Sequence, residues 1–195
     1  MNKRLITIVS LSVFLAACED DSQRSEQGGG PGSADPNNII AGDGFCSPTG
    51  GASALGDPSY TSSSTAKIDT DGNPAMQGHD ADWKAHTSGK VNGQDVNSAQ
   101  YAYVVMSKDQ MAASGVSLGD WALVTNNATG QSAWARVEDV GPDGGTGEIS
   151  QATATGVGIQ YQDNGFTVGD PSVTVNAYAG TAAIQGDCPT NIASS

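Results

Sequence analysis

The chain has 195 residues, with 8 basic and 21 acidic side chains, and its formal net charge is -13 at pH 7. A surface this acidic repels nucleic acid and anionic lipid headgroups, so the charge excludes both as general binding partners. Two explanations of the charge remain open, namely solubility outside the cell and attraction of a cationic ligand.

The N-terminal residues predict an export signal. A basic pair precedes an apolar run from Leu5 to Leu15, which is too short to span a bilayer because a spanning helix needs roughly 20 residues. Two alanines then provide the small residues that a signal peptidase accepts. The cysteine that follows, Cys18, resembles the lipidated cysteine of bacterial lipoproteins. We expect residues 1–17 to be a signal peptide and Cys18 to carry a lipid; an ordinary signal peptide is the alternative.

A lipid on Cys18 would anchor the protein at the bacterial cell envelope. The next residue is Glu19 rather than the aspartate associated with inner-membrane retention, which favours the outer membrane or the cell surface. The anchor would be the chain's sole membrane contact. Without residues 1–17 the chain keeps 6 basic and 21 acidic residues, and its formal charge becomes -15.

Composition divides the exported chain into a linker and a domain. Residues 18–42 contain few apolar groups and a Gly-Gly-Gly-Pro-Gly-Ser segment, which is typical of a flexible tether. Residues 43–195 have the usual size of one domain, and we expect a monomer. Cys46 and Cys188 lie near the ends of this domain, and export favours a disulfide between them over two free thiols. Such a bridge would close a loop of about 140 residues.

Short periodic segments predict a mainly β domain. Tyr101–Met106, Trp121–Thr125, Ser132–Val140 and Val173–Tyr178 are rich in β-branched and aromatic residues and are bounded by turn residues, as in an antiparallel sheet or barrel. We expect a small six-stranded β-barrel, of which the double-psi barrel is one form. One or two short helices would accompany it: Ser107 with Gln110 forms a capping box, and Ser150 is a second candidate cap.

Two acidic residues on either side of a turn predict a catalytic pair. Alternation in the Ser132–Val140 strand places Asp139 on the apolar face of Ala133, Ala135 and Val137. The glycine-rich turn after it reverses the chain, so that Glu148 can return to face Asp139. Converging carboxyl groups are what glycoside hydrolysis requires. An apolar environment would raise the pKa of Asp139, and a helix N-terminus would keep Glu148 ionised. The alternative for Asp139 is a turn residue.

Other polar and aromatic residues allow several interpretations. Asp69 and Asp71 could bind ammonium groups of a substrate, form a turn, or coordinate calcium, although the sequence after Gly72 departs from the EF-hand pattern. His79 and His86 are too few for a zinc site, which needs three or four ligands; a polar loop is expected there. Trp83, Tyr101 and Tyr103 could stack on sugar rings, and core packing is the default for the tyrosines. We expect no metal and no cofactor.

An ordered set of motifs resembles glycoside hydrolase family 75, the fungal-type chitosanases. The matching segments are Ala66-Lys-Ile-Asp69-Thr-Asp71-Gly72, Tyr103-Val-Val-Met106, Leu118-Gly-Asp120-Trp-Ala122, Asp139-Val-Gly-Pro142, Gly147-Glu148-Ile-Ser150 and Ala154–Ile159. The resemblance implies endo-hydrolysis of chitosan, a polymer of β-1,4-linked glucosamine, with inversion at the anomeric carbon. It assigns the essential carboxyl groups to Asp139 and Glu148, with Glu148 as the proton donor. Thr70 stands where many relatives have cysteine.

Three functions therefore remain to be distinguished. The first is a chitosan-cleaving hydrolase whose partner is this cationic polysaccharide. The second is a non-catalytic lipoprotein of the same fold that binds carbohydrate or the cell envelope. The third is an enzyme that acts on peptidoglycan or another glucosamine-containing wall polymer.

Overall fold

The structure is a computed structural model that describes residues 46–187. The predicted signal peptide, the predicted lipidation site Cys18 and the predicted linker of residues 18–42 lie outside this range, as does Cys188. Between residues 46 and 187, no helix has the length and apolar character needed to cross a membrane.

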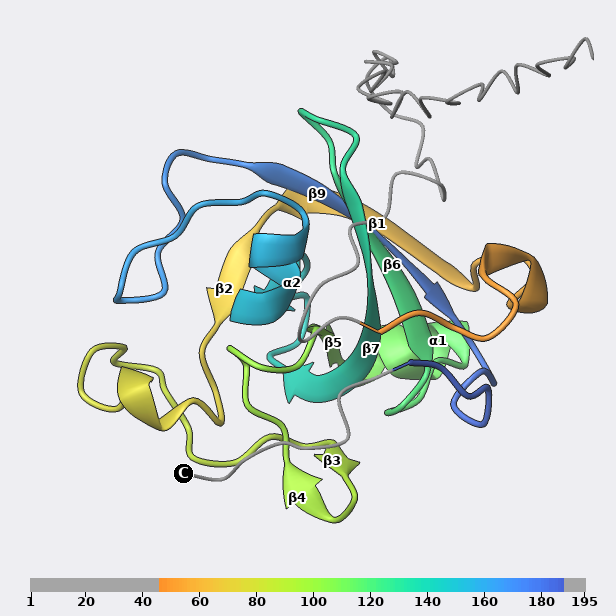
Figure 1. The fold of residues 1–195 in the computed structure, drawn as a ribbon, viewed down its shortest axis with the longest axis horizontal. Helices are drawn as coiled ribbons and strands as arrows, with labels where there is room; N and C mark the ends of the chain where they lie inside the picture. The colour runs from red at the N-terminus through yellow and green to blue at the C-terminus, as the bar shows by residue number, and fades with distance from the viewer. Residues whose placement is uncertain (1–45, 188–195) are drawn as a thin grey trace, which may run out of the picture.

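A single curled sheet dominates the fold (Figure 1). Its seven strands follow the order β1-β9-β6-β7-β5-β8-β2, and β3 and β4 form a separate hairpin. The strands are β1 (Tyr60–Thr65), β2 (Lys67–Asp69), β3 (Lys90–Val91), β4 (Gln94–Asp95), β5 (Tyr103–Ser107), β6 (Trp121–Asn126), β7 (Ser132–Gly141), β8 (Glu148–Ser150) and β9 (Ser172–Tyr178). The mainly β class is confirmed. The expectation of antiparallel pairing alone is wrong, because β5 pairs with β7 and β2 with β8 in parallel.

One extended segment supplies both edges of the sheet. Only Ala66 separates β1, which pairs with β9, from β2, which pairs with β8. The backbone N–H of Ala66 donates to Pro171 O at 2.8 Å, whereas that of Lys67 donates to Gly147 O at 2.9 Å. The chain thus changes partner strands within one residue. The sheet has seven strands instead of the predicted six because this change divides one segment into two.

Both faces of the central strands are buried. Small and branched residues such as Ala122, Val124 and Val137 form one cluster with residues of α2, and aromatic residues including Trp121 and Trp134 form a second cluster on the opposite face. Alternation in β6 therefore separates two apolar sets rather than an apolar set from a polar one. The two apolar clusters hold the central strands in place from both faces, and polar residues gather at the ends of these strands.

The two α-helices begin at the predicted caps. In α1 (Lys108–Ser114), Ser107 Oγ accepts from Gln110 N and the Gln110 side chain accepts from Ser107 N, which completes the capping box. Two short 3-10 helices lie at Ala52–Ala54 and Pro74–Met76. The second α-helix, α2 (Gln151–Gly156), begins at Ser150. Ser150 Oγ accepts from Tyr103 N and from Thr153 N and donates to Tyr101 O, so one hydroxyl joins β5 to the helix that follows β8.

Candidate functional site

A polar cleft with a volume of about 860 Å³ collects the four predicted acidic site residues. It lies where β2, β7 and β8 meet the segments around residues 80–88 and 164–167. Its ionisable lining residues are Lys67, Asp69, Asp71, Asp80, Asp82, Lys84, His86, Asp139 and Glu148. Asp69, Asp71, Asp139 and Glu148, which are up to 79 positions apart in the sequence, thus face one common space.

The pairing of β2 with β8 positions Glu148 beside the Asp69 segment. Lys67 is opposite Glu148 and Asp69 is opposite Ser150 in parallel register. Residues opposite each other, or two apart on one strand, share a face of the sheet, so Lys67, Asp69 and Glu148 lie on one face. Asp69 is the last residue of β2, and Asp71 follows in the turn beyond it.

A β-bulge in β7 corrects the predicted orientation of Asp139. Val104 pairs with Val137, but the next residue of β5, Val105, pairs with Asp139, so Glu138 is the extra residue. A bulge of this kind re-aims the side chains that follow it. Asp139 therefore shares a face with Val105, which lines the cleft, and not with Val137 in the apolar cluster.

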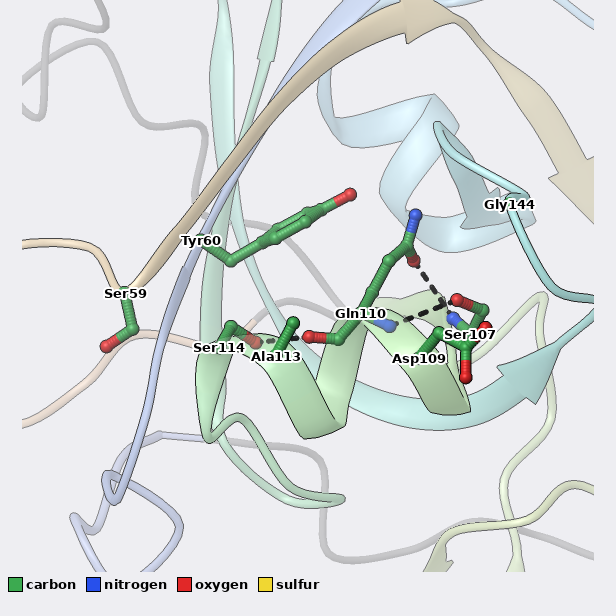
Figure 2. A pocket seen from close by; sticks show the side chains of 8 residues that line it. All are labelled: Ser59, Tyr60, Ser107, Asp109, Gln110, Ala113, Ser114 and Gly144. Carbon is green, nitrogen blue, oxygen red and sulfur yellow. Dashed lines mark hydrogen bonds between the residues drawn. The ribbon is translucent and has the colours of Figure 1, made fainter.

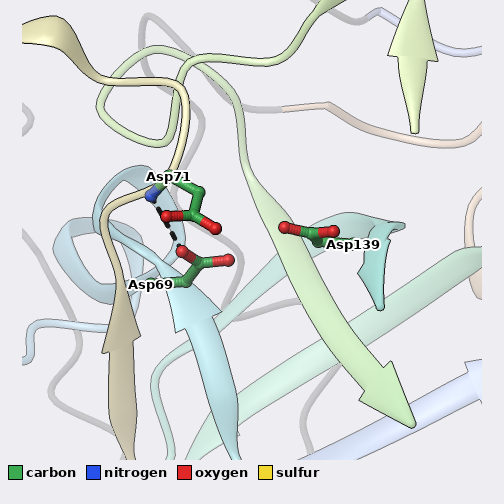
Figure 3. Close-up of side chains that lie close together, drawn as sticks. All are labelled: Asp69, Asp71 and Asp139. Carbon is green, nitrogen blue, oxygen red and sulfur yellow. Dashed lines mark hydrogen bonds between the residues drawn. The ribbon is translucent and has the colours of Figure 1, made fainter. Parts of the chain in front are cut away.

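Three of the carboxyl groups form a compact cluster. Each of Asp69, Asp71 and Asp139 contributes an oxygen, and these oxygens all lie within 4.8 Å of one another (Figure 3). Asp69 Oδ1 accepts the backbone N–H of Asp71 at 2.8 Å, and this is the predicted turn. Such a cluster offers three oxygen ligands to an ammonium group or to a divalent cation. Calcium takes six to eight oxygens, so water or other ligands would have to complete its shell.

Burial and mutual repulsion keep a proton on this cluster. The pKa of Asp69 is raised to about 8, and burial is the largest cause. The charges of Asp71, Glu148 and Asp139 add to the rise, whereas the hydrogen bond from Asp71 N–H lowers the pKa. Burial and the charge of Asp139 also raise the pKa of Asp71 to about 6, although the N–H of Lys84 opposes this. Like charges this close do not all ionise readily at neutral pH, and the higher pKa of Asp69 makes it the group of the two that retains a proton to higher pH.

Glu148 and Asp139 have contrasting environments. Burial raises the pKa of Glu148, the charge of Asp139 adds to this, and Lys67 opposes it. Burial therefore opposes the ionised form that the sequence predicted for Glu148. Asp139 Oδ1 instead accepts two backbone N–H groups, from Ser88 at 2.9 Å and from Val140 at 2.7 Å. Bonds of this type stabilise a carboxylate.

Glycine at position 141 allows the Glu148 carboxyl group to approach β7. A Cβ placed on Gly141 would lie 3.3 Å from Glu148 Oε2 and 2.9 Å from Val105 Cγ1. Gly141 is two residues beyond Asp139 on β7, a span of about 6.6 Å along a strand. The carboxyl group of Glu148 thus lies against the same strand end that carries Asp139.

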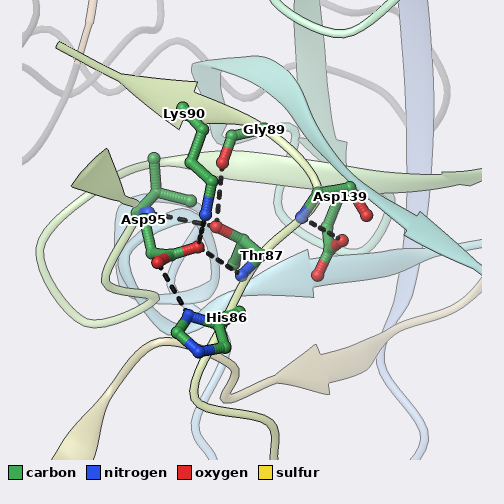
Figure 4. Close-up of polar contacts among 8 residues, drawn as sticks. His86, Thr87, Gly89, Lys90, Asp95 and Asp139 are labelled. Atoms are coloured by element: carbon green, nitrogen blue, oxygen red, sulfur yellow. Dashed lines mark hydrogen bonds and ion pairs between the residues drawn. The ribbon is translucent and has the colours of Figure 1, made fainter. Parts of the chain in front are cut away.

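A hydrogen-bonded hairpin fixes the donor to Asp139 (Figure 4). Asp95 accepts from Lys90, from His86 Nδ1 at 2.8 Å and from Thr87 N at 3.1 Å. The bonds from Lys90 and His86 hold the pKa of Asp95 down to about 2. This network ties the β3–β4 hairpin to the segment that presents Ser88 N to Asp139. His86 thus has a structural partner, in keeping with a polar loop.

Neither histidine joins a metal-ligand group. In residues 46–187 the one cluster of three candidate ligands consists of Asp69, Asp71 and Asp139. His79 is exposed. No group of candidate ligands in this part of the chain includes a histidine.

The tyrosines are packed in the core, as predicted by default, and the alternative of sugar stacking by Tyr101, Tyr103 or Trp83 has no support among the cleft residues. Tyr101 and Tyr103 are 2% and 0% exposed and belong to the aromatic core cluster, and Trp83 is not among the cleft residues. An aromatic residue that sequence reasoning missed, Phe166, does line the cleft. Phe166 follows an Asp-Asn-Gly turn and belongs to no periodic pattern that would predict a binding role. In the sequence, the one indication of such a role was a single aromatic residue within a polar segment.

A second pocket of about 460 Å³ lies over α1 (Figure 2). Hydroxyl groups of Ser59, Tyr60, Ser107 and Ser114 line it, together with a single carboxyl group, that of Asp109. It shares no lining residue with the cleft. With one carboxyl group it lacks the pair that glycoside hydrolysis requires.

No family model matches the chain, and no curated protein is significantly similar to it. The resemblance to family 75 therefore depends on the motifs of the sequence alone.

Proposed function

We propose that the protein is an endo-acting glycoside hydrolase that cleaves β-1,4-linked glucosamine polymers such as chitosan. The observation that carries the proposal is the meeting of Asp139 and Glu148 in one acidic cleft. The two residues enter it from the end of β7 and the start of β8, with a pKa-raising environment at Glu148 and two N–H donors at Asp139.

The charge of the cleft favours a cationic polymer. Six carboxyl groups but only two lysines line it, so the cleft remains acidic even with Asp69 protonated. Glucosamine units carry ammonium groups near or below their amine pKa, and carboxylates attract them. An anionic polysaccharide would be repelled by the same surface.

The environments of the two residues support distinct roles. Glu148 would protonate the glycosidic oxygen as its bond to the anomeric carbon breaks. Asp139 would accept a proton from the water that attacks this carbon from the opposite face. With Oδ1 held by two N–H groups, Oδ2 of Asp139 accepts no hydrogen bond from the described residues and is the oxygen available to water. We propose inversion because the resemblance to family 75 implies it; this outcome requires a water between the carboxyl groups, at a separation of about 6.5–9.5 Å.

Substitution of the pair tests the proposal. Glu148→Gln and Asp139→Asn should each lower kcat on chitosan at least 100-fold, because general acid–base catalysis contributes about 10²–10⁴-fold. Asp143→Asn, in the exposed turn between the two residues, is the control and should leave the rate unchanged. Viscometry measures endo-cleavage, and NMR of the first product gives the anomer. Unchanged cleavage by Glu148→Gln would refute the site.

The same assays distinguish the other functions. Wild-type protein that binds chitosan without lowering its viscosity would indicate a non-catalytic binding lipoprotein. Release of fragments from purified sacculi, with chitosan left intact, would indicate a wall-polymer hydrolase. A lipid on Cys18 and location at the cell envelope stay predictions of the sequence, and the proposed mechanism requires no cofactor.

A further inference from the structure

Phe166 is a large apolar side chain that the fold leaves uncovered. Its exposed fraction is 69%, and the other large apolar side chain that is exposed between residues 46 and 187 is Val168, at 54%. Phe166 lines the acidic cleft, whereas Val168 does not. A single exposed apolar residue is ordinary, so the position of Phe166 beside the carboxyl groups is what requires an explanation.

The segment that carries Phe166 is held by its own hydrogen bonds. Phe166 O accepts from Gln162 N at 2.8 Å, and Phe166 N donates to Asn164 Oδ1 at 3.2 Å. An antiparallel bridge between Tyr161 and Thr167 closes the turn. The ring therefore projects from a fixed backbone, and little conformational entropy would be lost on binding.

The turn also presses against the segment that carries the acidic cluster. A Cβ on Gly165, whose φ is +80°, would lie 3.1 Å from both Asp80 Oδ2 and Thr70 Cγ2. Thr70 Oγ1 donates to the same Asp80 oxygen at 2.6 Å. This contact fixes Phe166 relative to Asp80 and to the segment between Asp69 and Asp71.

We propose that Phe166 is a stacking platform for a glucosamine unit of the polymer, in a subsite beside the carboxyl cluster. This rests on the proposed function. A β-linked glucosamine ring has an apolar face of axial C–H groups and a cationic amino group at its edge. The aromatic ring would cover the first while cleft carboxylates bind the second, and the ammonium group is also attracted to the ring face.

The negative charge of the cleft favours a glucosamine polymer over a lipid surface or a second copy of the chain. An anionic lipid surface would be repelled by the carboxyl groups that line the cleft. A second copy of the chain would bring a surface of the same sign, because the full chain has a net charge of -13. A glucosamine polymer is the occupant that supplies both an apolar face and positive charge.

The experiment compares Phe166→Ala, Phe166→Trp and Val168→Ala in steady-state hydrolysis of chitosan. Phe166→Ala should raise KM about 5- to 30-fold and change kcat less than twofold, because stacking of this kind contributes about 1–2 kcal/mol and each 1.4 kcal/mol is tenfold. Phe166→Trp should stay within about threefold of wild type, and Val168→Ala should match wild type. Titration of a glucosamine hexamer into each variant should show the same order of affinities.

The outcomes separate this inference from the proposed function. Cleavage by wild type together with an unchanged KM for Phe166→Ala would overturn the platform alone. Binding without cleavage, with affinity lost in Phe166→Ala, would overturn the hydrolase and support the platform. Wild type that neither binds nor cleaves glucosamine polymers would overturn both. Loss of vesicle binding or of dimerisation in Phe166→Ala, with sugar binding intact, would assign the ring to those occupants and overturn the platform.

Discussion

Asp69→Asn should make the protein more stable and less active. Asp69 is 6% exposed, and its carboxyl group is crowded by other carboxyl groups of the cleft. Asparagine has the same shape and can accept the N–H of Asp71 in the same way. The substitution removes an ionisable group and leaves the local turn in place.

The magnitude follows from the two states of the Asp69 carboxyl group. Its pKa is about 8 in the folded protein and 3.8 in an exposed reference. Below pH 3.8 both states are protonated and Asp69 has no effect on the pH dependence. Between pH 4 and pH 8 the unfolded chain loses the proton and the folded protein keeps it, so stability falls as pH rises. From pH 4 to pH 7 the loss is about 4 kcal/mol, since each pH unit contributes about 1.4 kcal/mol.

Denaturant unfolding of wild type and Asp69→Asn from pH 4 to pH 8 measures this difference. The difference in free energy of unfolding between Asp69→Asn and wild type near pH 4 is the reference. We expect the variant to gain about 4 kcal/mol of stability over wild type, relative to this reference, by pH 7. Asp82→Asn removes a charge from the exposed wall of the same cleft and should show no such growth. A constant difference between Asp69→Asn and wild type over the whole range would refute the protonated cluster.

Two further predictions concern stability away from the cleft. The sequence predicts a disulfide between Cys46 and Cys188, so replacing both with serine should lower the free energy of unfolding by up to about 4–5 kcal/mol. A reductant should then destabilise wild type but not the double variant. Ser150→Ala should cost about 2–4 kcal/mol in the same assay, because it removes the cap of α2 and leaves buried strand groups unpaired, whereas Ser107→Ala at the cap of α1 should cost about 1 kcal/mol.

Local signals predicted both α-helices and the strands β5, β6, β7 and β9, but not β1, β2, β3, β4 or β8. The capping residues Ser107 and Ser150 act on N–H groups within three positions of themselves, and both helices begin where those residues indicate. The strand at Ser132–Val140 was likewise expected and extends by one residue to Gly141. The central strands β5 and β6 were recognisable as short apolar runs, because both of their faces are buried.

Long-range pairing decides the features that sequence reasoning missed. The bulge at Glu138 arises from the register of β7 against β5, and no pattern within β7 predicts which neighbour it has. Its effect on Asp139 was consequential, because one extra residue moves a side chain to the other face of a sheet. The exposure of Phe166 also depends on a contact of Gly165 with segments some 85–95 positions away.

The crowding that destabilises the cleft is consistent with a cationic substrate. In the free protein, burial first and the nearby carboxylates second raise the pKa of Asp69 to about 8. An ammonium group that enters the cluster reverses this balance, because it favours ionisation of every carboxyl group around it. The carboxyl groups whose burial and mutual repulsion lower the stability of the folded protein would thereby attract the ligand. Asp69→Asn removes both effects, so we expect the variant that gains stability at pH 7 also to lose affinity for glucosamine oligomers.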